Sequence, residues 1–437
     1  MQLEDLFHFL QAGVTPFHAA AEAARLLDAA GYTRLEESAY WNLEAGRGYY
    51  VTRNNSAVIA WRIPAHAIGG WRITASHSDS PAWRIKNTSV AAAGCTKLNV
   101  EGYGGMNMAT WLDRPLSVAG RVLVRGADGT LAARLVDLDR DLAVIPSLAP
   151  HMDRGVNDGH RYNPQVDMQP LYGPEGCRPL PALLAEALGV AEADMVDWDL
   201  TLYARQAPAV IGPAGEYFMA PRIDDLECAA TTLYAFLAAA PQADTACAPV
   251  WAMLDNEEVG SGTRQGAHSL FLRDVLGRIY DAVPHSAQGM QRALANSFVL
   301  SADNAHAMHP NFADKADAAN PVRMGGGIVL KVNASQKYTT SGLSGAVLRE
   351  VCRLAGVPVQ LFANRADLPG GSTLGNLQSQ SLPVPMADIG LAQLAMHSAV
   401  ETASTADADA MVKAVEMFYR VHLRCLGDGQ YTLEPAP

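Results

Sequence analysis

The spacing of hydrophobic and polar residues predicts a chain whose two ends alternate helices with strands, around a middle rich in strands. Near the N-terminus, an Ala-rich stretch favours a helix over residues 17–30. Thr15 can cap this helix, Pro16 suits its first turn, and Gly31 can end it. A short β-like run follows and ends at His77.

The middle of the chain, from about residue 90 to residue 220, carries more strand and turn signals than its flanks. Its clearest element is a β-hairpin. Residues 116–125 alternate between apolar and polar, Asp128-Gly129 favours a tight turn, and residues 130–136 return. This stretch therefore predicts a β-rich unit.

Towards the C-terminus, apolar helical patterns alternate with short apolar runs that are typical of buried strands. The predicted helices cover residues 226–240, 343–354 and 406–426. The predicted strands cover residues 249–254, 297–300, 328–332, 357–362 and 384–389. Ser404 or Thr405 can cap the last helix. Such alternation favours an α/β layer with a mostly parallel sheet, so we expect an α/β domain of residues 1–90 and 221–437, interrupted by a β-rich insertion of residues 91–220.

Composition and charge narrow the function. The chain has 437 residues and is 49% hydrophobic and 18% charged, which excludes wholesale disorder, collagen and coiled coil. Its 45 acidic and 33 basic residues argue against coating nucleic acid, because phosphate binding needs a basic face. No apolar run reaches the roughly 18 residues that cross a bilayer, and the acidic N-terminus is unlike a signal peptide. Six cysteines without a CxxC pair are typical of reduced thiols. We expect a cytoplasmic protein.

Polar residues gather where the predicted strands end, and open α/β sheets place their sites at such ends. Five segments share this position: residues 76–81, 221–225, 254–261, 301–310 and 396–398. Each alone is a weak signal, since a histidine after a strand is usually structural and an aspartate that opens a helix is usually a cap. Together they offer two histidines and several carboxylates beside apolar flanks. Buried charges need compensation there, and a pair of divalent ions would supply it.

The residue types narrow the chemistry further. Histidine, aspartate and glutamate without cysteine suit zinc, cobalt or manganese in a hydrolytic site. A two-ion site needs a bridging carboxylate, further ligands and an unligated base. Glu257 and Glu258 are adjacent, so one can bind an ion while the other takes a proton. His77 and Asp79 would project to the same side of a strand, where Asp79 can orient the imidazole.

Ordered sequence blocks extend this interpretation to nearly the whole chain. They are HSDSP (77–81), IPSLAPH (145–151), PRIDD (221–225), DNEEVGS (255–261), SADNAHAMHP (301–310), KVNASQKY (331–338), GSTLG (371–375) and LAMHS (394–398). In these blocks the chain resembles the aspartyl aminopeptidases, which are two-metal exopeptidases related in fold to other zinc aminopeptidases. One position departs from the family, which often has cysteine where this chain has Gly370.

The resemblance implies a role for each residue of the metal site. Five residues would hold two divalent ions, with zinc expected and cobalt or manganese as alternatives: His77 and Asp303 on one ion, Glu258 and His397 on the other, and Asp224 as the bridge. Glu257 would be the general base that activates a metal-bound water, and Asp79 would support His77. A catalytically silent binding protein on the same fold would lack a ligand or the base, and none is missing here.

The resemblance also implies how substrate is held. His306, Lys331 and Tyr338 match positions that face substrate, and His151 matches a histidine that reaches into a neighbouring subunit. Family members form tetrahedral dodecamers built from dimers and remove N-terminal residues from peptides, with aspartate or glutamate preferred. A preference for neutral residues such as leucine is the alternative. Lys331 could instead pair with a nearby carboxylate, and Tyr338 could belong to the core.

Overall fold

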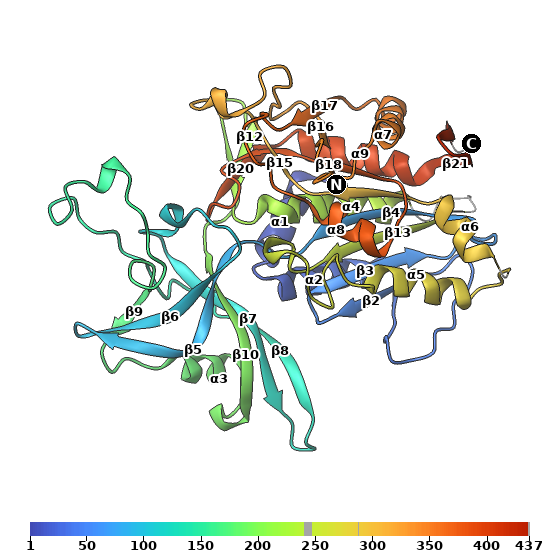
Figure 1. Cartoon of the computed structure of the whole chain (residues 1–437). Helices are drawn as coiled ribbons and strands as arrows, with labels where there is room; N and C mark the ends of the chain where they lie inside the picture. Colours follow the sequence, from blue (N-terminus) through green and yellow to red (C-terminus); the bar gives the residue numbers. More distant parts are fainter. Residues whose placement is uncertain (240–246, 287, 436–437) are drawn as a thin grey trace.

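The computed structural model describes residues 1–239, 247–286 and 288–435, and it contains two β-sheet bodies (Figure 1). A nine-stranded mixed sheet is covered by helices, and a six-stranded antiparallel sheet projects from it. The predicted fold class, a mixed and mostly parallel α/β sheet with a β-rich second unit, is confirmed. No helix within the described ranges is long and apolar enough to cross a membrane.

The nine-stranded sheet brings four parallel strands together at its centre. In spatial order its strands are β1 (Thr33–Arg34), β2 (Gly48–Arg53), β3 (Ala57–Arg62), β13 (Cys247–Leu254), β4 (Gly70–His77), β14 (Phe298–Ala302), β18 (Met386–Gly390), β16 (Ile328–Val332) and β17 (Val359–Ala363). The neighbours β13, β4, β14 and β18 run parallel to one another. Their carboxyl ends therefore meet at one edge of the sheet.

Helices cover both faces of this sheet. One face carries α1 (Leu3–Ala12), α2 (Pro16–Ala29), α4 (Ile223–Ala239), α7 (Gly342–Ala355) and α9 (Asp407–Arg420), and the other carries α5 (Phe271–Asp281), α6 (Gly289–Ala295) and α8 (Leu374–Ser381). Strand β13 shows the reason, because successive side chains of a strand point to opposite faces. Trp251 and Met253 pack with the first set of helices, and Val250 and Ala252 with the second.

The six-stranded sheet has its own hydrophobic core. Its strands, in spatial order, are β8 (Leu131–Asp137), β7 (Leu116–Arg125), β10 (Met195–Ala204), β5 (Ala82–Ala92), β6 (Cys95–Tyr103) and β9 (Leu171–Pro174). Helix α3 (Leu180–Leu188) packs into this core. Gly120 is required in β7, because a Cβ there would lie 2.0 Å from the carbonyl oxygen of Asp199 in β10.

Two smaller sheets complete the fold. One is formed by β11 (Ala209–Ile211), β12 (Tyr217–Ala220), β20 (Glu401–Ser404), β19 (Ala392–Leu394) and β15 (Ala305–His306), and the other by β21 (Val421–Gly427) and β22 (Gln430–Pro435). The insertion was predicted as residues 91–220, whereas the six-stranded sheet runs from Ala82 to Ala204 and β12 pairs with β20. We therefore propose that the inserted unit follows the sheet, over residues 82–204.

Most predicted elements are present near their expected limits. The N-terminal helix and the central hairpin are confirmed, and the Thr15 hydroxyl accepts the backbone N–H of His18. Strands β17 and β18 begin directly after Pro358 and Pro385, because proline cannot donate to the sheet. The predicted end of the helix at residue 240 lies outside the described residues.

The last predicted helix, over residues 406–426, was wrong in its last six residues. Helix α9 ends at Arg420, and residues 421–427 form strand β21. The reason is a change of period, since Val421 and Leu423 are buried while the residue between them is not. The predicted caps were also wrong, because Ala406 occupies the N-cap position. The Ser404 hydroxyl does accept the N–H of Ala406, at 3.2 Å.

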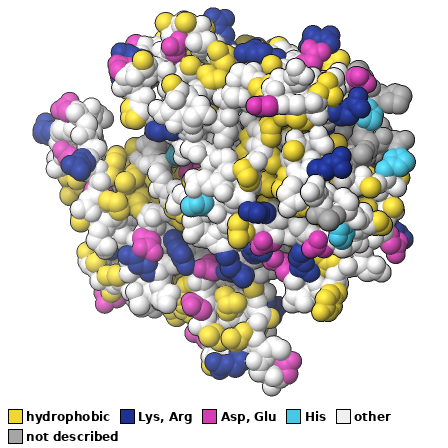
Figure 2. Space-filling model, turned by 45° about the vertical axis from the view of Figure 1, so that its right-hand side comes forward, with side chains coloured by type: hydrophobic (Ala, Val, Ile, Leu, Met, Phe, Trp, Pro, Cys, Tyr) yellow, Lys and Arg dark blue, Asp and Glu magenta, His cyan; other side chains and the backbone are white. Residues whose placement is uncertain are grey.

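Charged side chains of both signs are present on the surface, and the net charge is −12. On the face in Figure 2, acidic and basic side chains are interspersed with apolar ones. The acidic excess is therefore not gathered into one patch on this face. This face does not offer the basic stripe that nucleic acid requires.

Candidate metal centre

The candidate residues converge at the edge where the central parallel strands end. They are His77 and Asp79 at the end of β4, Glu257 and Glu258 directly after β13, and Asp303 directly after β14. Leu254 pairs with His77 in the sheet, so β13 and β4 end at the same level. Asp224 reaches this edge from the start of α4, and His397 reaches it from the loop between β19 and β20. The chain thus gathers seven predicted site residues from distant segments.

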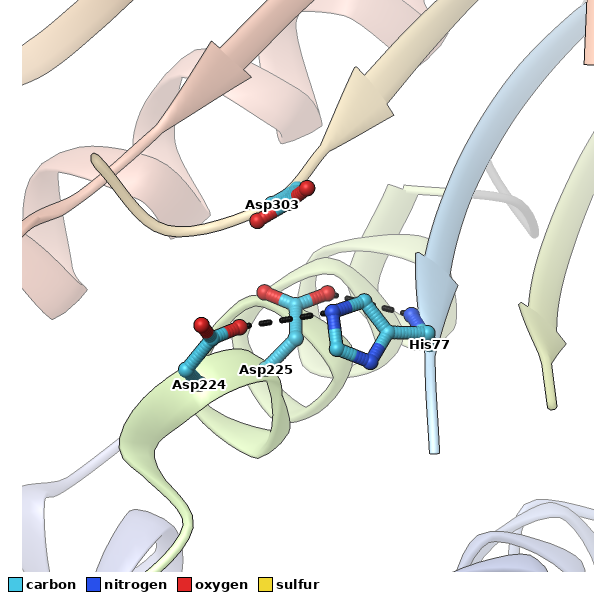
Figure 3. Close-up of side chains that lie close together, drawn as sticks. All are labelled: His77, Asp224, Asp225 and Asp303. Atoms are coloured by element: carbon cyan, nitrogen blue, oxygen red, sulfur yellow. Dashed lines mark hydrogen bonds and ion pairs between the residues drawn. The ribbon is translucent and has the colours of Figure 1, made fainter. Parts of the chain in front are cut away.

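One group surrounds the imidazole of His77 (Figure 3). His77, Asp224, Asp225 and Asp303 each offer one ligand atom within 4.8 Å of the others, and all four are buried. The Nε2 atom of His77 lies 3.3 Å from Oδ1 of Asp224. Asp225, which a cis peptide bond joins to Asp224, accepts the backbone N–H of His77 at 3.1 Å. Three carboxylates therefore share a small buried space with one histidine.

A second group lies on the other side of Asp224. Asp224, Glu258 and His397 offer ligand atoms within 4.8 Å of one another. The Nε2 atom of His397 is 3.4 Å from Oδ2 of Asp224 and 3.2 Å from Oε2 of Glu258. The two carboxylate oxygens of Asp224 thus face two different histidines, so Asp224 stands between the two groups.

Both imidazoles are fixed in the same way by a backbone carbonyl. Nδ1 of His77 is 3.0 Å from the carbonyl oxygen of Asp79, and Nδ1 of His397 is 2.7 Å from that of Gly105. A carbonyl oxygen only accepts, so each Nδ1 carries a proton and each Nε2 faces the cluster. When Nε2 gives up its own proton, this is the tautomer that a metal-binding histidine uses.

Asp79 holds more of the site than the imidazole that it was expected to support. Its carbonyl oxygen and its Oδ1 atom lie 3.0 and 3.5 Å from Nδ1 of His77, and its carboxylate also accepts the backbone N–H groups of Glu257 and Glu258 at 3.0 and 3.1 Å. It also accepts the hydroxyl of Tyr103 at 2.7 Å, and that hydroxyl accepts an amide N–H of Asn256 at 2.9 Å. Asp79 therefore fixes the turn that carries the two glutamates.

The inserted sheet contributes to the centre through the loop that follows β6. The last residue of β6 supplies the Tyr103 hydroxyl, and this loop supplies the Gly105 carbonyl described above. Between them, Gly104 has a φ of +74°, and a Cβ there would lie 3.1 Å from Cβ of Glu258. Glycine therefore permits the close approach of the two bodies at the cluster.

Burial and neighbouring charges shift the pKa values of the cluster residues. Burial alone would lower the pKa of His397, but Asp224 outweighs it and raises that pKa to about 9. Burial, reinforced by Asp224, raises the pKa of Glu258 well above its ordinary value. Burial also raises the pKa of Glu257 to about 8, with neighbouring carboxylates adding to the effect and His77 opposing it. The protein alone therefore holds protons in the cluster that a cation would displace.

The donor set fits divalent ions. Within the described part of the chain, three buried carboxylate oxygens of the cluster accept no hydrogen bond: Asp224 Oδ1, Asp225 Oδ1 and Glu258 Oε1. Nδ1 of His77 is engaged by a carbonyl, so a cation would take the place of a proton between Nε2 and the facing Asp224 oxygen. Two ligands of a tetrahedral zinc ion, each about 2.1 Å from it, are about 3.4 Å apart. The contacts of 3.2–3.4 Å match that spacing.

The residues predicted to face substrate differ in how far they are buried. Lys331 is 3% exposed, and its ammonium donates to the carbonyl of Asn304 at 2.7 Å and lies 3.5 Å from Oδ1 of Asp303. Its ammonium also sits 5.7 Å from the ring centroid of the buried Tyr338. His306 is exposed at the end of β15. His151 is exposed on a loop of the inserted unit, and no hydrogen bond or ion pair joins it to the cluster among the described residues.

Sequence reasoning missed residues that hold the ligands without belonging to a motif. Glu401 accepts the backbone N–H groups of Asp224 and His397, at 3.0 and 2.7 Å. Tyr103 lies outside the blocks that signalled the site. The signal available for Glu401 was a glutamate four residues after a candidate ligand, in a segment that otherwise has no acidic residue and no Lys or Arg.

Comparisons with known proteins agree with this geometry. The family model described as aminopeptidase I zinc metalloprotease (M18) matches residues 9–419. A curated protein of Pseudomonas aeruginosa strain UCBPP-PA14, named probable M18 family aminopeptidase 2, is 40% identical over 426 residues, which cover 95% of this chain and 97% of the relative.

Solved structures share the fold over the same extent. The cryo-EM structure of the Ape4 and Nbr1 complex matches with a TM-score of 0.92 and 33% identity, covering 95% of this chain and 85% of the matched chain. The mApe1 dodecamer of S. cerevisiae matches with a TM-score of 0.85 and 26% identity, covering 95% and 96%. The match includes both the helix-covered sheet and the inserted unit, given its extent.

Proposed function

Since the chain belongs to the aminopeptidase I zinc metalloprotease (M18) family, we propose how this metalloaminopeptidase divides the work among its residues. Two divalent ions, with zinc expected and cobalt or manganese as alternatives, are held at the cluster. His77 and Asp303 bind one ion, Glu258 and His397 bind the other, and Asp224 bridges them. The substrate is a peptide with a free N-terminus.

One observation carries this proposal. The two oxygens of Asp224 face Nε2 of two histidines at 3.3 and 3.4 Å, while both Nδ1 atoms are engaged by carbonyls. Both Nε2 atoms and both carboxylate oxygens thus point at two separate positions. A bridging carboxylate between two ions requires this arrangement.

Glu257 acts as the general base. Bound ions would polarise the scissile carbonyl and lower the pKa of water at the site. The carboxylate of Glu257 lies beside this position because Asp79 fixes the turn through the N–H groups of Glu257 and Glu258. Glu257 takes a proton from the attacking water and passes it to the amine that leaves. Such help contributes roughly 10²–10⁴-fold to the rate.

We further propose a preference for N-terminal aspartate or glutamate, set by Lys331. Its ammonium has three N–H groups. Two are directed to Asn304 and Asp303, which leaves one for a substrate carboxylate. Tyr338 borders this position, and His306 lies further out. The alternative is a preference for neutral residues such as leucine, in which Lys331 only balances the charge of Asp303. The burial of Lys331 and its contact with Asp303 support this alternative.

The same family membership suggests how protomers associate. A structural relative is described as a dodecamer, and we propose that this chain forms a homo-oligomer of that kind, a tetrahedral dodecamer built from dimers. In it, His151 would complete the substrate site of a neighbouring subunit, as its exposed loop allows. The cytoplasm is the proposed location.

A single purified sample tests the proposed function. Metal content is measured per protomer, and hydrolysis is compared over a panel of aminoacyl substrates at equal concentration. Two ions and a faster reaction with aspartyl or glutamyl than with leucyl substrates are expected. Full activity after exhaustive chelation, with no metal detected, would overturn the two-ion proposal, and a leucyl preference would favour the alternative.

A further inference from the structure

Glu401 lies directly behind the candidate metal centre and touches two of its ligands. It is the first residue of β20 and is 2% exposed. Its Oε2 atom accepts the backbone N–H of Asp224 at 3.0 Å, and Oε1 accepts that of His397 at 2.7 Å. One buried carboxylate therefore joins the bridging residue to a ligand 173 positions further along the chain.

The two ligands need such a restraint. His397 has a φ of +64°, in the left-handed region that non-glycine residues rarely adopt. Asp224 lies at the start of α4, where the backbone is not yet helical. Neither backbone is therefore fixed by regular structure, and both N–H groups end on Glu401.

The carboxylate itself is held in orientation by a chain of side-chain amides. Gln393 donates to Oε1 of Glu401 at 3.3 Å, and its own oxygen accepts an N–H of Asn304 at 2.7 Å. The Asn304 amide also donates to Glu227 at 2.9 Å. Because each amide has a partner for both its oxygen and its nitrogen, the direction of every donor is fixed.

We propose that Glu401 is a positioning residue of the metal centre, whose carboxylate aligns Asp224 and His397 and so sets the affinity for the ion between them. The inference rests on the proposed function. Both oxygens of the carboxylate are needed as acceptors, one for each ligand. Glutamine has the same shape but a single acceptor oxygen, so its NH₂ group would oppose one of the two backbone N–H groups.

Glu401→Gln tests this directly by metal binding, without recourse to activity. The chelated protein is titrated with Co²⁺, followed by calorimetry and by the visible absorption of the bound ion. We expect the ion held by Glu258 and His397 to bind roughly 10–100-fold more weakly, the range found when groups supporting a ligand are removed. The affinity for the ion at His77 and Asp303 is expected to fall less, since Asp224 is the only ligand of that ion that Glu401 contacts.

Glu227→Gln is the matched control. Glu227 is buried on the same helix as Asp224, and it accepts one bond through Oε2 while Oε1 has no partner in the described structure. A glutamine keeps that single bond, so Co²⁺ should bind as in the wild type. Equal losses in both variants would overturn the proposal, because they would reflect the removal of any buried carboxylate.

Thermal unfolding of the metal-free proteins separates positioning from stability. A lower melting temperature of Glu401→Gln with unchanged Co²⁺ affinities would make Glu401 merely structural and would overturn the proposal. If that variant folds poorly, Gln393→Met removes the third bond to Glu401, together with the acceptor for Asn304, and should show a smaller loss on the same ion; unchanged binding would count against the proposal. A wild-type chain that binds no Co²⁺ would instead refute the proposed function itself.

Discussion

The metal cluster and the residues predicted to face substrate differ in how completely one chain holds them. In the cluster, the imidazoles of His77 and His397 are fixed by carbonyls, and backbone groups of Asp224 and Glu258 are fixed by buried carboxylates. On the substrate side, His306 and His151 are exposed. Lys331 is buried, but its ammonium already has partners within the chain.

The difference supports the proposal that one protomer holds the ions alone and that its substrate site is completed by the substrate or by a neighbouring subunit. A ligand set must be in place before an ion arrives, because metal affinity depends on orientation. A substrate pocket can be completed by the substrate or by a neighbouring subunit. Substitutions in the cluster should therefore strongly lower activity with every substrate. Substitutions on the substrate side should lower activity less, and only with some substrates.

Asp224→Asn should have the largest effect. The amide offers one neutral oxygen where two anionic oxygens face the two groups, so both ions should be weakened and activity should fall to background with all substrates. Metal content per protomer, measured after dialysis, checks this. Retention of two ions with wild-type turnover would mean that Asp224 does not bridge.

Glu257→Gln and Glu258→Gln form a matched pair of adjacent substitutions. Glu257→Gln should keep the metal content and lower kcat by roughly 10²–10⁴-fold, because an amide cannot accept the proton. Glu258→Gln should lose the ion that it shares with His397. The reverse pattern would exchange the roles of base and ligand between the two residues.

The affinity of the metal-free protein for zinc should rise with pH. Although burial opposes it, Asp224 raises the pKa of His397 to about 9, so below that pH the ion must displace a proton. Affinity should increase by up to about tenfold per pH unit for each proton displaced. Competition titrations between pH 6 and pH 9 measure the slope, and an affinity independent of pH would contradict a cluster that holds protons in the absence of metal.

Lys331→Met should have the smallest and most selective effect. It should lower kcat/KM for aspartyl or glutamyl substrates by about tenfold, which is about 1.4 kcal/mol, and spare leucyl substrates. Lys337→Met is the control, since this lysine of the same segment donates to the carbonyl of Gly370 instead. Equal losses on acidic and neutral substrates would assign Lys331 to balancing Asp303, and metal content measured on the same sample would show whether that balance is needed.

Much of the fold and the set of clustered residues follow from local sequence signals. The apolar runs before His77, Glu257 and Asp303 predict buried strands, and parallel strands bring their ends to one edge. The period change at Val421 was overlooked because the preceding helical pattern ran into it. Local patterns therefore predict which candidate site residues come together better than they predict where helices and strands end.

The supporting contacts could not be predicted in this way. Glu401 and Asp224 are 177 residues apart, and Gly105 and His397 are 292 apart. These bonds involve backbone groups, which every residue carries, so no residue type marks them in a sequence. The double use of Asp79, by its carbonyl toward His77 and by its carboxylate toward Glu257, is hidden for the same reason.

An anomalous-difference map of zinc-loaded crystals tests the central claim most directly. The account predicts two peaks, one on each side of the Asp224 carboxylate and about 3.5–4 Å apart, as in two-metal sites. One peak should lie against Nε2 of His77 and the other against Nε2 of His397. A single peak, or two peaks that do not share Asp224, would contradict the account.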